Sequence, residues 1–354
     1  MNGYIVLETG ECFPGKWQGG EPAAGEVVFN TSHSGYEEIA TDPSYFSQIM
    51  VFTSAMQGNY GADSAVWESD SIHLQGVVCL EMQKSIRDRS WLDKLEEFSV
   101  PVISEVDTRK LVLHLRDHGT VWGAMVQADS EEKAMVLANA LIETKKNKDA
   151  DWVYQVSTKE AFEVEGEKPL GPKVAILDFG SKQNIIRELK TRCSKIKVFN
   201  SRTSAEEIRA WSPDGIMLTN GPGDPSEVKV TVSTVSELLG QKFIFGICMG
   251  HQILCRALGG STYRLKFGHR GSNHPVKDEI LNKIYMTSQN HGYAVKHDSL
   301  PSAVKVSHTN LNDNTVSGIS CPSKNCLSVQ FHPESHPGPR ESDVIFDYFI
   351  EQLS

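Results

Sequence analysis

The sequence contains no long apolar run and no tract of positive charge. A helix needs about 20 consecutive apolar residues to span a bilayer, and no stretch of the 354 residues approaches that length. The 35 Lys and Arg residues are outnumbered by 45 Asp and Glu residues, so the net charge is −10. Nucleic-acid phosphates attract clustered positive charge. We therefore expect neither a membrane nor a nucleic acid as a partner.

A disulfide framework is lacking as well. The seven cysteines are odd in number and irregularly spaced, whereas secreted domains carry even, regularly spaced sets. The first ten residues show no basic segment followed by an apolar stretch, which is the pattern of a secretory signal. Hydrophobic residues at 39% and charged residues at 23% are typical of a globular protein. We expect a cytoplasmic protein of about two domains, at roughly 150 residues per domain.

The stretch from 157 to 172 predicts the boundary between the two domains. It is rich in Glu, Lys and Gly, and it closes with Pro169 and Pro172. A segment of this composition buries little and ends regular structure, as linkers do. The sequence therefore predicts an N-terminal domain over 1–156, a linker over 157–172 and a C-terminal domain over 173–354.

Short apolar runs alternate with helix-compatible stretches after the linker. The predicted strands are 174–177, 197–200, 216–218 and 243–247, and the predicted helices are 183–190, 230–239 and 251–258. Ser204 and Glu207 form a helix capping box. Such alternation indicates crossover connections, so we predict an α/β fold with a doubly wound, mostly parallel sheet covered on both faces. Ligands of such sheets bind outside the carboxyl ends of the strands.

The N-terminal part is rich in β-forming segments and turn signals. Candidate strands are 26–30, 48–53 and 76–80, and 109–117 could be helical. This pattern predicts a smaller, mixed α/β or β-rich domain.

Cys248 stands at the centre of a G-x-C-x-G segment, Gly246–Gly250. This is the cysteine form of a strand–turn–helix nucleophile elbow, in which the glycines remove side chains that would clash in so tight a turn. The turn projects the sulfur at the start of a helix, whose dipole favours thiolate over thiol. We therefore predict that Cys248 is a nucleophile. Other cysteines suit buried core positions better, namely Cys79, Cys193 and Cys255.

A thiol nucleophile needs a base, and His332 is the candidate. It follows a predicted strand, and residues two apart in extended backbone point the same way, so Glu334 can orient the imidazole and stabilise its charged form. The oxyanion that develops on an attacked amide also needs donors. The backbone N–H of Met249 is one, and the segment 221–224, whose glycines allow close approach of the backbone, is expected to supply a second.

With these residues assigned, the chain resembles class I glutamine amidotransferases from about residue 173 to the end. The matching motifs are Asn220–Pro225, Gly246–Gln252 and Phe331–Glu334. The resemblance implies that Cys248 attacks the γ-amide carbon of glutamine and forms a glutamyl thioester. It also implies that His332 protonates the departing ammonia and then activates water.

The leading half is similar to the small-subunit family of carbamoyl phosphate synthetase. In that half the residues that carry the similarity are Val27–Ser32, Gly35, Tyr36, Thr41–Tyr45 and Asp107–Arg109. In the second half Phe267–Gly271 and Asn273–Val276 fit the same family, so the resemblance extends over nearly the whole chain. The resemblance implies that glutamine is held by Ser44, Gly221, Gly223, Met249, Gln252, Asn290, Gly292 and Tyr293. In this set Gln252 and Asn290 offer amide groups, and Gly292 lets the chain pass close by. Some family members carry Leu and Phe in place of Met249 and Tyr293, a change that backbone contacts survive.

The chain has no phosphate-binding loop of the form G-x-x-x-x-G-K-[ST] and no G-x-G-x-x-G between a strand and a helix. We therefore expect no cofactor in this chain. The resemblance implies a large partner subunit that uses ATP and Mg to make carbamoyl phosphate from bicarbonate and receives the ammonia through an internal passage. The expected assembly is a heterodimer or a higher oligomer of heterodimers, with the N-terminal domain as the docking surface.

Alternative interpretations remain open. A metal could be held by His332 and His336 or by His269 and His274, but neither pair has a known zinc spacing, so we expect no metal. A stand-alone cysteine hydrolase, the glutaminase subunit of another synthetase, and an inactive amidotransferase that regulates a partner are the other candidates. His336 and Arg340 have no assigned role.

Overall fold

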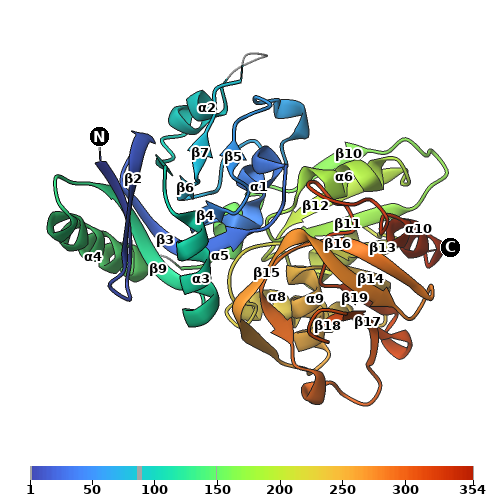
Figure 1. The fold of residues 1–354 in the computed structure, drawn as a ribbon. Coiled ribbons are helices and arrows are strands. Elements are labelled where there is room, and N and C mark those ends of the chain that lie inside the picture. Colours follow the sequence, from blue (N-terminus) through green and yellow to red (C-terminus); the bar gives the residue numbers. More distant parts are fainter. Residues whose placement is uncertain (1, 86–89, 149, 354) are drawn as a thin grey trace. The chain divides into compact units, whose positions relative to one another are not determined.

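The computed structural model describes residues 2–85, 90–148 and 150–353, which divide into two compact units, 1–150 and 151–354 (Figure 1). This division falls a few residues before the boundary that composition predicts at 156. Among the residues described, no helix has both the length and the apolar character that crossing a membrane requires.

The first unit is built on a closed β-barrel. Around the barrel the strands follow the order β1 (Asn2–Leu7), β2 (Cys12–Gly19), β8 (Val102–Ser104), β6 (Gly76–Val78), β4 (Gln48–Phe52), β3 (Ala23–Asn30) and β9 (Val121–Gln127). A separate two-stranded sheet joins β5 (Met56–Gln57) and β7 (Glu81–Met82). The helical segments are α1 (Tyr36–Thr41), η1 (Pro43–Tyr45), η2 (Ser64–Val66), α2 (Trp91–Glu97), α3 (Thr108–His118) and α4 (Glu131–Lys148). The predicted strands and helix of this part correspond to β3, β4, β6 and α3, but closure into a barrel was not predicted.

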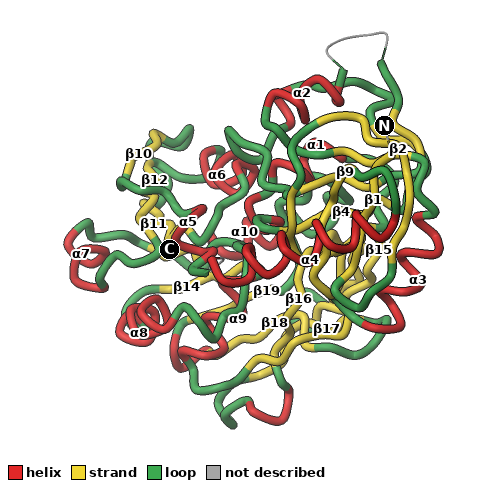
Figure 2. The backbone as a smooth tube through the Cα atoms, turned by 90° about the vertical axis from the view of Figure 1, so that its left-hand side faces the viewer, coloured by secondary structure: helices red, strands yellow, loops and turns green. Residues whose placement is uncertain are grey.

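Alternation along the strands separates the interior of the barrel from its outer layer. In β1, Ile5 and Leu7 join one buried cluster, whereas Tyr4 and Val6 join another that includes Ala134 from α4. Successive side chains of a strand point to opposite faces, so a single strand serves both layers. Figure 2 shows α4 beside the barrel strands. Its small buried residues Ala134 and Ala138 pack against side chains of these strands.

The second unit contains one large sheet within residues 150–353. Its order is β10 (Phe162–Glu165), β12 (Lys195–Asn200), β11 (Lys173–Asp178), β13 (Gly215–Leu218), β14 (Phe243–Ile247), β19 (Cys326–Val329), β18 (Val316–Cys321), β16 (Lys283–Val295), β15 (Thr262–Asp278) and β17 (Lys305–Asn310). The run from β12 to β19 is parallel. The helical segments are α5 (Trp152–Val156), α6 (Gln183–Lys190), α7 (Ala205–Ala210), α8 (Lys229–Leu238), α9 (Met249–Ala257), η3 (His297–Ser299), η4 (Pro322–Lys324) and α10 (Val344–Glu351).

Helices cover both faces of the parallel run. In β11, Val174 and Ile176 join a buried cluster with residues of α6 and α10, such as Phe346. Ala175 and Leu177 join a second cluster with residues of α8 and α9. This α/β arrangement brings the carboxyl ends of β11, β13, β14 and β19 to one edge, as expected of parallel strands.

Two parts of this sheet differ from the sequence prediction. The expected linker over 157–172 contains the edge strand β10, which pairs antiparallel with β12. Its charges suggested a loop, but Glu163 pairs with Lys195 and Lys197 of β12 at 2.8 and 3.7 Å, so the acidic residues lie on a solvated strand face. The antiparallel extension from β18 to β17 was not predicted either. Register shifts in the β15–β16 hairpin interrupt the alternation that would reveal it.

Candidate active site

Cys248 lies in a strained turn between β14 and α9. Its φ and ψ are 53° and −102°, a conformation that non-glycine residues rarely adopt and that clusters at functional sites. Its backbone N–H donates to the carbonyl of Val329 at 2.9 Å, which ties the turn to β19.

Both glycines of the G-x-C-x-G segment are required by close packing. A Cβ added to Gly246 would lie 2.7 Å from the backbone carbonyl of Gly250. A Cβ added to Gly250 would lie 2.3 Å from the carbonyl oxygen of Leu218. Such distances are shorter than carbon–oxygen contact allows, so only glycine keeps the turn in place.

The sulfur of Cys248 is held at the start of α9. The side chain is only 2% exposed, and its thiol donates to the carbonyl of Asn290 at 3.5 Å. Cys193 and Cys255 lie elsewhere in the core, where burial raises the pKa of each to about 12, and their thiols are correspondingly inert.

His332 and Glu334 form a buried pair. Nδ1 of His332 donates to Oε1 of Glu334 at 2.6 Å, and both residues are 2% exposed. The expected reason for their proximity, alternation along an extended strand, is wrong: the two residues lie in a turn after β19, where His332 bridges to Ser288 of β16. The turn curls the carboxylate back onto the imidazole.

Lys182 completes this line of charges and was not predicted from the sequence. Its Nζ lies 3.2 Å from Oε1 of Glu334, and its side chain is 3% exposed. Nζ also donates to the carbonyl of Ser335, while the side chain of Asn184 donates to the carbonyl of Glu334. The feature of the sequence that could have indicated Lys182 is its position, because it follows β11 at the carboxyl edge of the sheet.

Neighbouring charges control the protonation of this group. Burial alone would raise the pKa of Glu334, but Lys182 and His332 outweigh it and lower the pKa to about 2. Burial alone would lower the pKa of His332, but Glu334 and the adjacent Cys248 outweigh it and raise the pKa to about 10. At neutral pH the carboxylate and the imidazolium are therefore both charged.

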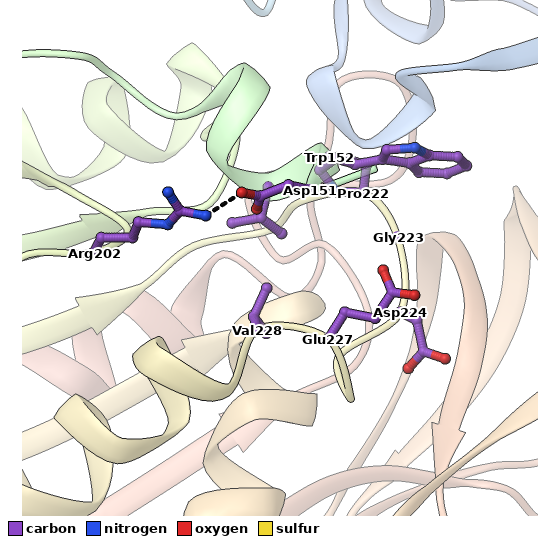
Figure 3. A pocket seen from close by; sticks show the side chains of 9 residues that line it. Asp151, Trp152, Arg202, Pro222, Gly223, Asp224, Glu227 and Val228 are labelled. Carbon is purple, nitrogen blue, oxygen red and sulfur yellow. Dashed lines mark hydrogen bonds and ion pairs between the residues drawn. The ribbon is translucent and has the colours of Figure 1, made fainter. Parts of the chain in front are cut away.

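The glycine-containing loop after β13 approaches the neighbouring loop closely. A Cβ at Gly221 would lie 2.3 Å from the carbonyl oxygen of Phe179. Gly223 has a φ of +90°, and Trp152 of α5 lies 3.6 Å from the position of its missing Cβ. Figure 3 shows this loop beside a pocket of about 210 Å³. The pocket is lined by Asp151, Trp152, Val153, Arg202, Pro222, Gly223, Asp224, Glu227 and Val228.

The other predicted glutamine-site residues of this unit gather near Cys248. Gln252 donates from Nε2 to the carbonyl of Tyr293 at 2.9 Å and to Oε1 of Gln330 at 3.1 Å. Gly292 has room for a larger residue, since the nearest atom to an added Cβ is 3.5 Å away. Met249 opens α9, directly after the nucleophile. The start of α9 and the segment 290–293 are thus joined by hydrogen bonds.

Ser44 belongs to the other unit. It lies in η1, is 5% exposed, and its backbone N–H donates to Oδ1 of Asp42 at 2.8 Å. Its place in the glutamine site stays a prediction.

The histidines considered as metal ligands have other neighbours. His269 contacts Asp313 at 2.9 Å. Burial is the main cause that lowers the pKa of His336, to about 4, and the nearby cations Lys182, Arg340 and Arg187 lower it further toward that value. No group of three His, Cys, Asp or Glu side chains suited to a metal occurs among the residues placed in the structure.

Comparison with known proteins gives matches over nearly the whole chain. Residues 175–352 match the family model of class-I glutamine amidotransferases, and residues 5–125 match that of the CPSase domain of the carbamoyl-phosphate synthase small chain. The carbamoyl phosphate synthase small chain of Staphylococcus saprophyticus is 41% identical, with 99% of this chain and 96% of the relative covered. That of Symbiobacterium thermophilum is 42% identical (97% and 96%), and that of Methanopyrus kandleri is 42% identical (99% and 98%).

Proposed function

Because the chain belongs to the carbamoyl phosphate synthase small chain family, we propose that it releases ammonia from glutamine at Cys248 and passes it to a large synthetase subunit. Its amidotransferase domain and its relatives make it the glutamine-hydrolysing subunit of carbamoyl-phosphate synthase. The role of each residue in the reaction is our proposal.

The first half of the reaction forms a thioester. We assign the proton of Cys248 to His332 from the outset, in line with the raised pKa of the ring, and the thiolate attacks the γ-amide carbon of glutamine. The carbon–nitrogen bond then breaks as His332 returns a proton to the departing nitrogen, which leaves as ammonia. The glutamyl group remains bonded to the sulfur.

The second half regenerates the enzyme. His332 takes a proton from a water molecule, whose oxygen attacks the thioester carbon. The carbon–sulfur bond breaks, glutamate leaves, and the proton stays on His332, which restores the starting imidazolium beside the sulfur. Glu334 holds the ring in one tautomer throughout and stabilises its charged form, and Lys182 keeps Glu334 ionised.

Each half of the reaction passes through an oxyanion. The backbone N–H of Met249 follows the nucleophile, as in other elbows, and we assign it as one donor; the second comes from the loop of Gly221 and Gly223. Gln252, Asn290, Gly292 and Tyr293 bind the amino-acid end of glutamine.

The partner supplies the remaining chemistry. The large subunit binds ATP and Mg, activates bicarbonate and accepts ammonia before it is protonated by water. The two chains form a heterodimer or a higher oligomer of heterodimers in the cytoplasm, with the first unit as the docking surface.

The observation that carries the proposal is the buried line of charge from Lys182 through Glu334 to His332, next to Cys248. We expect Cys248→Ser to lower glutamine hydrolysis roughly a thousandfold or more, as the loss of a catalytic nucleophile does. Glutamate release should be measured on the purified protein, with and without the co-expressed large chain. Association with that chain should persist.

Cys255→Ser is the matched control, since this cysteine lies in the same helix but faces the core. It should keep turnover within a few fold of the wild type. Normal hydrolysis by Cys248→Ser would refute the mechanism. A wild-type complex that never releases glutamate would support the inactive, regulatory alternative.

A further inference from the structure

The side-chain amide of Asn220 joins two loops at the carboxyl edge of the sheet. We propose that Asn220 is a positioning residue that sets the charge line of Lys182, Glu334 and His332 in register with the oxyanion loop. The inference rests on the proposed function and adds a residue to it. Asn220 does not touch the reacting atoms in this scheme; it acts through the backbone of its neighbours.

The contacts of Asn220 use both ends of its amide. Oδ1 accepts the backbone N–H of Lys182 at 3.1 Å, and Nδ2 donates to the carbonyl of Gly180 at 2.9 Å. Asn220 is 0% exposed, so water cannot replace either bond. An unsatisfied buried group costs about 1–3 kcal/mol, which makes the loop after β11 dependent on this side chain.

The loop that Asn220 holds is the one that holds Glu334. Lys182 and Asn184 together contact the carboxylate of Glu334 and the carbonyls of Glu334 and Ser335. A shift of this loop would therefore move the carboxylate against His332. Asp178 fixes the other end of the loop by accepting N–H groups of Gly180 and Ser181 at 2.9 and 2.7 Å.

On its other side Asn220 is bonded to the oxyanion loop. It directly precedes Gly221, whose backbone lies against Phe179. The preceding residue, Thr219, accepts the N–H of Gly250 at 2.9 Å through its carbonyl and the N–H of Phe179 at 2.9 Å through its hydroxyl. The segment 219–221 thus contacts the loop of Lys182, the start of α9 and the expected oxyanion donors at once.

A double-mutant cycle tests whether Asn220 acts through Lys182. Asn220→Ala and Lys182→Met should each lower kcat for glutamine hydrolysis roughly 10- to 100-fold, the scale of a small misplacement of catalytic groups, with KM changed less. The kcat of the double variant should be little lower than that of the less active single variant, because both substitutions disturb the same line of charges from Lys182 through Glu334 to His332. Effects that multiply would overturn the proposal.

Asn220→Asp supplies a second readout, the pH dependence of kcat, which a purely structural role of Asn220 would not change. An ionised Asp accepts from Lys182 but cannot donate to Gly180, whereas a protonated Asp does both. The ratio of its kcat to that of the wild type should therefore rise as the pH falls. A ratio independent of pH would also count against the proposal. This variant keeps the size of the side chain, so it guards against a failure of Asn220→Ala to fold.

Asn310→Ala is the matched control. Asn310 is also 0% exposed, and its Oδ1 accepts the N–H of Asn312 in a turn after β17. Its kcat and pH profile should match the wild type. Cys248→Ser is included to distinguish a failure of the proposed function from a failure of the role of Asn220. If Cys248→Ser is inactive while the effects of Asn220→Ala and Lys182→Met multiply, only the role of Asn220 is wrong.

Discussion

Glu334 is the residue on which the opposite charges of the site converge. Its carboxylate contacts the ammonium of Lys182 at 3.2 Å and the ring of His332 at 2.6 Å, out of reach of water. The first contact lowers the pKa of the carboxylate, and the carboxylate in turn raises that of the imidazole. A change at this residue should therefore be visible in the protonation of His332.

Glu334→Gln should shift the basic limb of the pH profile of kcat/KM for glutamine toward lower pH. Without the carboxylate, burial lowers the pKa of His332 from about 10, so the imidazolium that protonates ammonia is lost earlier as the pH rises. The rate should fall as well. Steady-state glutamate release between pH 6 and 10 measures both effects.

Glu165→Gln provides the control, because this carboxylate is exposed on β10 and pairs with Lys195. Its profile should coincide with that of the wild type. An unchanged basic limb in Glu334→Gln would show that Glu334 does not control the ring.

Site residues could be predicted from the sequence where they lie in a recognisable local motif or close to one another in the chain. Cys248 is marked by its flanking glycines, and His332 and Glu334 are neighbours in the chain. Lys182 has no such signal, since its contact with Glu334 joins segments far apart in the sequence and depends on the order of strands in the sheet. A lone lysine after a strand resembles any solvated residue until that order is known.

The elbow is an element whose sequence is dictated by packing. Gly250 lies against β13, and the carbonyl of Leu218 occupies the space that a side chain would need. Gly292 lies in β16, where an added Cβ would make only an ordinary contact, 3.5 Å from Nη2 of Arg270. The two glycines should therefore respond differently to the same substitution.

Gly250→Ala should destabilise the second unit and abolish glutamine hydrolysis, because either α9 or β13 must move. Gly292→Ala should fold with a melting temperature near that of the wild type and change mainly KM for glutamine. Thermal unfolding and steady-state kinetics of the two variants distinguish these outcomes. Equal stability of the two variants would contradict the packing argument.

At the element scale, the parallel strands followed from apolar runs, and the edge elements did not. Buried strands such as β11 and β14 carry continuous apolar sequence that only a covered sheet explains. The strand β10 is polar because its side chains are mostly exposed, so composition alone resembled a linker. Pairing of its glutamates with lysines of β12 became visible only with the register.

The two units have separate hydrophobic clusters, and the charge line belongs to the second unit alone. The ionisation of this line should therefore affect the stability of that unit. Glu334 has its pKa lowered from 4.5 to about 2, so its contribution is present above pH 4.5 and is lost as the pH falls toward 2. His332 has its pKa raised from 6.5 to about 10, so its contribution is present below pH 6.5 and is lost as the pH rises toward 10.

We expect the free energy of unfolding of the wild type to exceed that of Glu334→Gln most between pH 4.5 and 6.5, by about 3–5 kcal/mol for a broken buried pair. Urea unfolding followed by hydrogen exchange of peptides from residues 151–354 measures this difference. Peptides from the barrel serve as the control and should not change. A difference that is constant from pH 3 to 9 would contradict the linkage.

The adjacency of β14 and β19 has one more consequence. The sulfur and the imidazole are set by hydrogen bonds between neighbouring strands, including the one from Cys248 to Val329, and not by the contour length of the chain that runs between them. Extra residues at the hairpin tip, after the last pair of β15 and β16 at Asp278 and Lys283, would lengthen that path and leave the reacting atoms where they are. The distance between the sulfur and the imidazole is therefore independent of the length of this loop.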